Sequence, residues 1–186
     1  MNIKTTLVWL CLVIFSSLTV NANEKIATNP ELKIITNQGD ITVELFANQA
    51  PVSVKNFLNY VDSGFYEGTV FHRIIADFMI QGGGFTTDMK RKPTRPSIVN
   101  EANNGLKNDR GTLAMARTSV VNSATSQFFI NVKDNAWLNH NPRNFGYAVF
   151  GRVTDGMDIV DKLSKVATGR QDRPISPIII RSIHRI

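Results

Sequence analysis

Arg73 is a charged residue inside residues 69–75 (TVFHRII), a short apolar run that is typical of a β-strand. Side chains alternate between the two faces of a strand, so Arg73 is expected on the face of Phe71, with His72 on the opposite face. A guanidinium is permanently charged and offers several N–H donors in fixed directions. Arg73 can therefore stabilise electron density that develops on a bound ligand, but it cannot act as a general base.

Two further runs place polar and apolar side chains on one face. Met79 and Gln81 point the same way in residues 78–81, and Gln127 shares a face with Phe129 in residues 127–132. Such mixed faces suit neither a dry core nor a plain solvated surface. They are typical of an apolar pocket with a few aimed donors, which is how ligand sites are built. We expect this pocket on the outward face, which disfavours a small-molecule carrier with its pocket inside a barrel.

Other common kinds of site find little support. The histidines His72, His140 and His184 are too dispersed to predict a metal site. Ser126 lacks the G-x-S-x-G context of a hydrolase nucleophile. Residues 82–84 (GGG) are followed by neither a Lys-Ser/Thr pair nor a helix start, so we interpret them as a tight exit from a strand rather than a phosphate cradle. No metal and no cofactor is predicted.

The formal net charge of +6 raises the question of an acidic partner. Most basic residues are scattered, and the one cluster, within residues 90–95, contains Pro93 and is typical of a solvated loop. We therefore expect no nucleic-acid partner.

Residues 1–22 differ from the remainder of the chain. Residues 7–20 form an uncharged apolar run behind Lys4, short for a membrane span and about the length of a signal-peptide core. We expect cleavage after Ala22, then a polar lead-in over residues 23–30 and one domain over residues 31–186; the alternative is a retained anchor helix. Cleavage would remove Cys11, the only cysteine, which suits an oxidising compartment. A bacterial periplasm without stable membrane association fits best.

The segments that must position the candidate side chains are mainly β. Residues 32–36 and 41–46 alternate apolar and polar side chains around NQGD, which predicts a hairpin. Further short β-like runs cover residues 69–75, 78–81, 112–116, 127–132 and 147–153. A last strand over residues 177–183 is expected to pair with the first hairpin.

Two helices are predicted beside these strands. Apolar residues at helical spacing indicate an amphipathic helix over residues 51–62, begun near Pro51 and stopped at Gly64. A second should be capped by Asp155 and run through Leu163, with Asp158 in its first turn. Many short strands without βα alternation favour a closed antiparallel barrel whose ends the helices plug.

Five blocks of sequence, in order, resemble the signature of the cyclophilins. They are FHRII at residues 71–75, FMIQGGGF at 78–85, SQFFI at 126–130, WL at 137–138 and FGRV at 150–153. The resemblance extends from about residue 32 to residue 183 and is closest to bacterial periplasmic members. It implies a mainly β fold, a closed eight-stranded antiparallel β-barrel with two capping α-helices, and a site on its outer face.

The resemblance also implies roles for individual residues. Arg73 matches the catalytic arginine, and His72 matches a neighbouring site histidine that we expect to orient rather than to react. The expected substrate-binding residues are Phe78, Met79, Leu138 and Phe129 around the proline ring, Gln81 and Gln127 at the substrate backbone, and Ala116, Arg117, Thr118, Trp137 and Tyr147 around them.

The implied activity is peptidyl-prolyl cis/trans isomerisation by a monomer without cofactors. Its partners would be unfolded or flexible polypeptides that contain proline, and Trp137 would support binding of the inhibitor cyclosporin. Arg117 replaces the usual asparagine of the peptide-binding edge, and Tyr147 stands where many eukaryotic members have histidine, so substrate preference is expected to differ. The alternative is a proline-peptide-binding chaperone module without turnover, which the retention of Arg73 disfavours.

Overall fold

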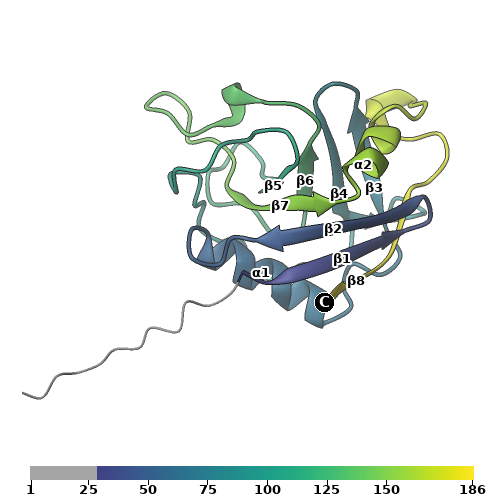
Figure 1. Ribbon diagram of the computed structural model, residues 1–186, viewed down its shortest axis with the longest axis horizontal. Helices are drawn as coiled ribbons and strands as arrows, with labels where there is room; N and C mark the ends of the chain where they lie inside the picture. Colours follow the sequence, from purple (N-terminus) through teal and green to yellow (C-terminus); the bar gives the residue numbers. More distant parts are fainter. Residues whose placement is uncertain (1–28) are drawn as a thin grey trace, which may run out of the picture.

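The computed structural model describes residues 29–186, in which the β-strands close into one barrel (Figure 1). The predicted signal peptide, residues 1–22, and most of the predicted lead-in lie outside the described residues. The strands are β1 (Glu31–Thr36), β2 (Gly39–Leu45), β3 (Thr69–Ile75), β4 (Met79–Thr86), β5 (Thr112–Met115), β6 (Phe128–Asn131), β7 (Val149–Asp155) and β8 (Ile179–Arg185).

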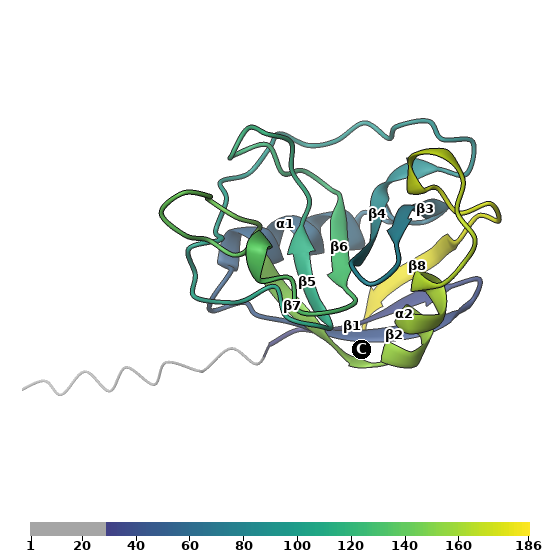
Figure 2. The ribbon, with the colours of Figure 1, turned by 90° about the horizontal axis from the view of Figure 1, so that it is seen from above.

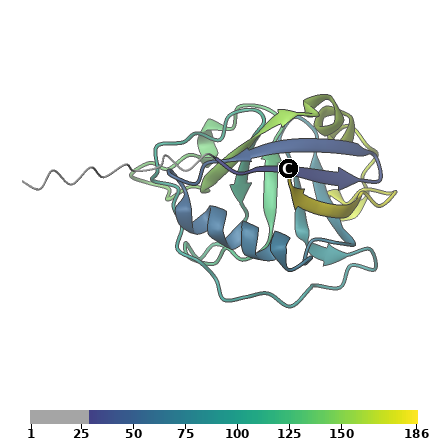
Figure 3. The same ribbon diagram turned by 60° about the horizontal axis from the view of Figure 1, so that its bottom comes forward.

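The strand order around the barrel is β1-β2-β7-β5-β6-β4-β3-β8, and each neighbouring pair is antiparallel. The last strand, β8, closes the barrel by pairing with β1 and β3, as Figure 3 shows for β1. The predicted closed eight-stranded barrel, and the predicted pairing of the last strand with the first hairpin, are both confirmed.

Helices α1 (Pro51–Asp62) and α2 (Met157–Ser164) lie on opposite sides of the barrel (Figures 1 and 2). Helix α1 begins with proline at its first turn, as predicted, and buries Phe57 completely. The Phe57 ring lies 5.3 Å from Phe128 of β6 and 5.2 Å from Phe150 of β7, measured between ring centroids. These aromatic contacts hold α1 against the core residues of the barrel. Among the described residues, no helix combines the length and apolar character needed to cross a membrane.

The predicted cap of α2 is wrong. Asp155 is the last residue of β7, and the N-cap is Gly156, whose φ of 82° lies in the left-handed region. A Cβ at this position would lie 2.4 Å from the carbonyl oxygen of Asp40, so the start of β2 leaves no room for a side chain. The chain therefore turns from strand to helix on a glycine. Asp158 does stand in the first turn of α2, as predicted.

Strand β3 carries a β-bulge that the strict alternation did not predict. Phe71 pairs with Gly82 and Arg73 with Gln81, so that His72 is an extra residue in the register. The side chains of Phe71 and Ile74 therefore both join the barrel core, whereas Arg73 lines an outer cavity. The prediction that Phe71 and Arg73 share a face, with His72 opposite, is wrong because the bulge shifts the alternation by one residue.

The triple glycine of residues 82–84 is also not a strand exit, because β4 continues through it to Thr86. A Cβ on Gly82 would lie 2.9 Å from the Phe71 ring, so these glycines allow β4 to pack closely against its surroundings. The interior beneath them is filled by apolar side chains from all around the barrel, among them Ile34, Val43 and Phe150.

Candidate active site

A cavity of about 180 Å³ opens on the outer face of the barrel. Its lining residues are Arg73, Phe78, Met79, Gln81, Ala116, Arg117, Phe129, Trp137, Leu138 and Tyr147. Met79, Phe129 and Leu138 belong to an apolar cluster separate from the barrel core, whereas their strand neighbours Ile80 and Ile130 belong to the core. The outward-facing pocket expected from strand alternation is therefore present.

Strand register brings the key side chains into one row. Arg73 of β3 pairs with Gln81 of β4, which pairs with Phe129 of β6. The bulge at His72 sets this alignment, because without the extra residue the β3 register would slip relative to β4. The local sequence of β3 and its partner strand thus jointly determine where the arginine points.

The cavity has an apolar floor and an aromatic wall. Met79, Phe129 and Leu138 are almost completely buried. The Phe78 ring stacks on Trp137 at 5.1 Å between centroids, and Trp137 remains 63% exposed. A surface of this kind can take up a small apolar ring and keep water away from it.

Arg73 and Gln81 are polar residues that line this cavity from neighbouring strands. The Arg73 side chain is 43% exposed, and its Nε donates to Oδ2 of Asp172 at 3.3 Å. Nε2 of Gln81 donates to Oε1 of Gln127 at 2.9 Å. Gln127 does not line the cavity itself but contacts Gln81, which does.

His72 lies outside the cavity. Its ring packs against Phe85 at 4.6 Å and lines a separate groove of about 210 Å³ with residues that include Arg173 and Ile175. Burial lowers the pKa of His72 to about 4, and the nearby charges of Arg173 and Arg73 act in the same direction, so the ring is neutral at pH 7. The bulge turns His72 outward beside Arg73 but into a different groove.

Of residues 116–118, Ala116 and Arg117 line the cavity. The Arg117 guanidinium lies 4.7 Å from the Tyr147 ring centroid, and its Nε donates to the Gly146 carbonyl at 3.0 Å. Ala116 lines the cavity, while Thr118 is exposed, lies outside it and hydrogen-bonds Ser123. Arg117 thus presents a fixed positive charge where an asparagine was expected from the resemblance.

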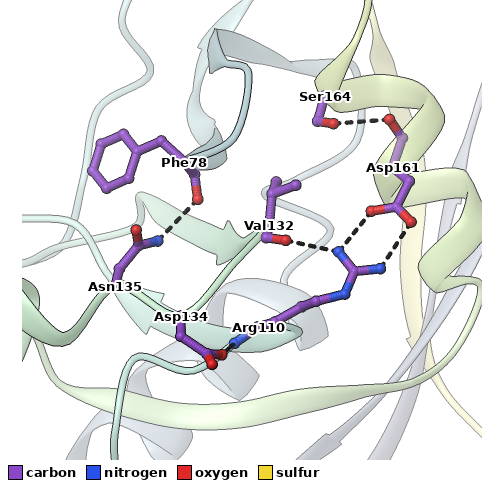
Figure 4. Close-up of polar contacts among 7 residues, drawn as sticks. All are labelled: Phe78, Arg110, Val132, Asp134, Asn135, Asp161 and Ser164. Atoms are coloured by element: carbon purple, nitrogen blue, oxygen red, sulfur yellow. Dashed lines mark hydrogen bonds and ion pairs between the residues drawn. The ribbon is translucent and has the colours of Figure 1, made fainter.

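Buried asparagines that the sequence analysis did not single out hold the cavity walls. Nδ2 of Asn135 donates to the Phe78 carbonyl at 2.9 Å (Figure 4), and Nδ2 of Asn108 donates to the carbonyls of Leu138 and Tyr147, both at 3.3 Å. Because these bonds fix backbone beneath three wall residues, the asparagines position the cavity without touching a ligand. Their spacing along the chain carries no recognisable signal.

The segment that carries Asn135 is tied to α2 by Arg110. Its guanidinium donates to the Val132 carbonyl at 2.7 Å and to both carboxylate oxygens of Asp161, at 2.7 and 2.8 Å (Figure 4). The backbone N–H of Arg110 donates to Asp134 at 2.8 Å. These bonds join the segment beside the cavity wall to helix α2.

The fold and the cavity together define a closed β-barrel with an outer apolar site beside a fixed arginine. A family model described as cyclophilin type peptidyl-prolyl cis-trans isomerase/CLD matches residues 31–185. The chain belongs to this family, and it is a peptidyl-prolyl cis-trans isomerase.

Relatives agree with this assignment. Peptidyl-prolyl cis-trans isomerase A of Dickeya dadantii is 57% identical over 159 residues, covering 83% of this chain and 84% of the relative. A peptidyl-prolyl cis-trans isomerase of Acinetobacter baylyi is 53% identical over 175 residues, covering 92% of each chain. A crystal structure of a Cryptosporidium parvum cyclophilin in the presence of the dipeptide Ala-Pro matches with a TM-score of 0.72 and 35% identity, covering 84% of this chain and 98% of that one.

Proposed function

We propose that this isomerase accelerates X-Pro bond rotation in exported proteins while they fold, by non-covalent stabilisation of the twisted transition state. The single observation that carries the mechanism is the position of Arg73 on the rim of an apolar cavity that Phe78, Met79 and Phe129 help to line. The structurally similar cyclophilin from Cryptosporidium parvum was crystallised in the presence of Ala-Pro, which supports a proline-containing ligand for the corresponding cavity here.

Rotation of an X-Pro bond breaks amide resonance, against a barrier of about 18–20 kcal/mol. At the twisted transition state the proline nitrogen becomes pyramidal and regains a localised lone pair. An N–H donor aimed at that nitrogen binds the transition state more tightly than either ground state, which is the requirement for catalysis. Arg73 supplies such a donor without any proton transfer, because its guanidinium remains charged throughout.

The apolar floor has a separate part in the mechanism. It anchors the proline ring while the preceding carbonyl rotates, and it excludes water that would compete for the arginine. A change from minutes to milliseconds requires about five powers of ten in rate, or about 7 kcal/mol. Ring anchoring together with one charge-assisted hydrogen bond in a partly dry site is a reasonable source of this stabilisation.

The test of the mechanism is cis-to-trans isomerisation of a short X-Pro peptide by the purified protein, compared with Arg73→Ala and Arg73→Lys. We expect Arg73→Ala to lose most turnover and retain the fold, and Arg73→Lys to recover little, since an ammonium lacks the planar set of donors. Wild-type turnover in Arg73→Ala would refute the mechanism. Peptide binding without turnover in the wild type would favour the non-catalytic chaperone module.

The export part of the proposal rests on residues 1–22, with their apolar run and small residues before the expected cleavage point. We propose that the mature protein begins at Asn23 and acts as a monomer in a bacterial periplasm. Cell fractionation with N-terminal sequencing and gel filtration tests this proposal. A protein that keeps residues 1–22 in the membrane fraction would support the retained anchor instead.

A further inference from the structure

The loop between α2 and β8 brings an acidic residue against Arg73. Asp172, 99 positions further along the chain, accepts a hydrogen bond from Arg73 Nε at 3.3 Å. Within residues 29–186 this is the only hydrogen bond of the Arg73 side chain. Both side chains are close to half exposed, at 43% and 45%, so the pair contributes little to folding stability.

The backbone of this loop is held in an unfavourable conformation at its tip. Gln171 and Asp172 have φ values of 61° and 57°, in the left-handed region, which most residues with a Cβ avoid and which is especially unfavourable for Gln171. Hydrogen bonds from Ile175 N–H to the Ala167 carbonyl, at 3.0 Å, and from Gly169 N–H to the Arg173 carbonyl, at 2.8 Å, close the loop beneath them. Strained backbone that is retained in this way clusters at functional sites.

We infer that Asp172 is a positioning residue for Arg73. By accepting the Nε hydrogen bond, its carboxylate fixes the plane of the guanidinium and leaves both Nη groups free to donate into the cavity that Arg73 lines. An arginine without this contact must be ordered during each catalytic cycle, at a cost in side-chain entropy. This inference rests on the proposed catalytic role of Arg73.

A carboxylate beside a catalytic cation could also have the opposite effect, by competing with the substrate for its donors. The geometry favours positioning, because the contact engages Nε, at the inner edge of the guanidinium, and no hydrogen bond joins Asp172 to either Nη group within the described chain. Asp172 also does not line the cavity, so it is placed beside the bound ligand rather than in its path.

The test measures kcat and KM for a proline peptide with Asp172→Ala, Asp172→Asn and the control Glu67→Ala, which removes the same charge from another exposed position. We expect kcat to fall about three- to tenfold in Asp172→Ala, with KM little changed. Asp172→Asn should be intermediate, since its amide oxygen still accepts from Nε. Glu67→Ala should behave as the wild type.

The same substitution is then made in the Arg73→Ala background. If Asp172 acts through Arg73, Asp172→Ala causes no further loss there, because the partner that it orients is absent. An equal loss in both backgrounds would indicate a structural role and overturn the inference, as would wild-type or higher kcat in Asp172→Ala. Wild-type turnover in Arg73→Ala alone would instead refute the proposed mechanism, so the two failures are distinguishable.

Discussion

Substitution of Gly84 by alanine is expected to impair catalysis while leaving the fold in place. A Cβ at Gly84 would lie 2.5 Å from Cγ of Gln127 and 2.7 Å from its Nε2. The backbone of Gly84 accommodates alanine, because its φ lies outside the left-handed region. The Gln127 side chain must therefore move from Cγ outwards, and we expect its 2.9 Å hydrogen bond from Gln81 to break.

The size of the effect follows from that hydrogen bond. A typical intramolecular hydrogen bond contributes about 0.5–1.5 kcal/mol. If Gln81 needs this bond to meet the substrate backbone in the transition state, kcat/KM should fall about two- to tenfold. The midpoint of thermal unfolding should fall by no more than about 5 °C, because about 1 kcal/mol corresponds to a shift of 2–4 °C in a domain of this size.

Gly83→Ala is the matched control, with the same chemical change at the neighbouring residue. Gly83 has a φ of +80°, and a Cβ there would lie 2.8 Å from the Tyr66 ring and 3.0 Å from the Phe128 ring. Left-handed strain of about 1–2 kcal/mol and overpacking of about 1–3 kcal/mol together predict a loss of about 2–5 kcal/mol in unfolding free energy. Equal destabilisation by both variants, or wild-type kcat/KM in Gly84→Ala, would refute this reasoning.

Two further predictions concern Trp137, which lines the cavity, and His72, which lies in the separate groove. Trp137→Ala should weaken cyclosporin binding in a titration and barely change the unfolding midpoint, because Trp137 is 63% exposed; equal affinities would contradict its expected role. The pKa of His72 is lowered from 6.5 to about 4, so the unfolded chain takes up its proton first as pH falls. The free energy of unfolding in urea should therefore drop by about 1–3 kcal/mol from pH 7 to pH 4, and by less in His72→Gln. The same drop in both proteins would show that other groups cause it.

The barrel could be predicted because its determinants are local and repeated. Alternation in the first hairpin, the helical period of α1 and the absence of βα alternation each point to the same fold, and consistent signals of this kind are informative. The cap of α2 could not be predicted in the same way. Asp155 is a good N-cap by residue type, but the carbonyl of Asp40 lies where a side chain after β7 would go. That contact exists only once β2 and β7 have paired.

In the site, too, features set by local sequence could be predicted, and features set by distant contacts could not. The apolar floor follows from alternation in β4 and β6, since Met79 and Phe129 stand on the face opposite the core. Asp172 could not be found from the sequence, because 99 residues separate it from Arg73 and only a left-handed loop brings the two together. The same holds for Asn108 and Asn135, because the wall groups that they bind are backbone carbonyls, which are present whatever the residue type.

The bulge in β3 explains why two consecutive polar residues, His72 and Arg73, line different grooves of the barrel surface. The extra residue in the register turns both His72 and Arg73 outward, one into each of two grooves. The α2–β8 loop meets both of them, with Asp172 against Arg73 and Arg173 in the groove of His72. Burial, assisted by the nearby positive charges of Arg173 and Arg73, lowers the pKa of His72 and keeps its ring neutral, whereas the carboxylate of Asp172 keeps Arg73 oriented. The loop therefore places a positive charge near His72 and a negative charge at Arg73, and of these two neighbours Arg73 is the one that presents a charge to a ligand in the cavity, which Arg117 also lines.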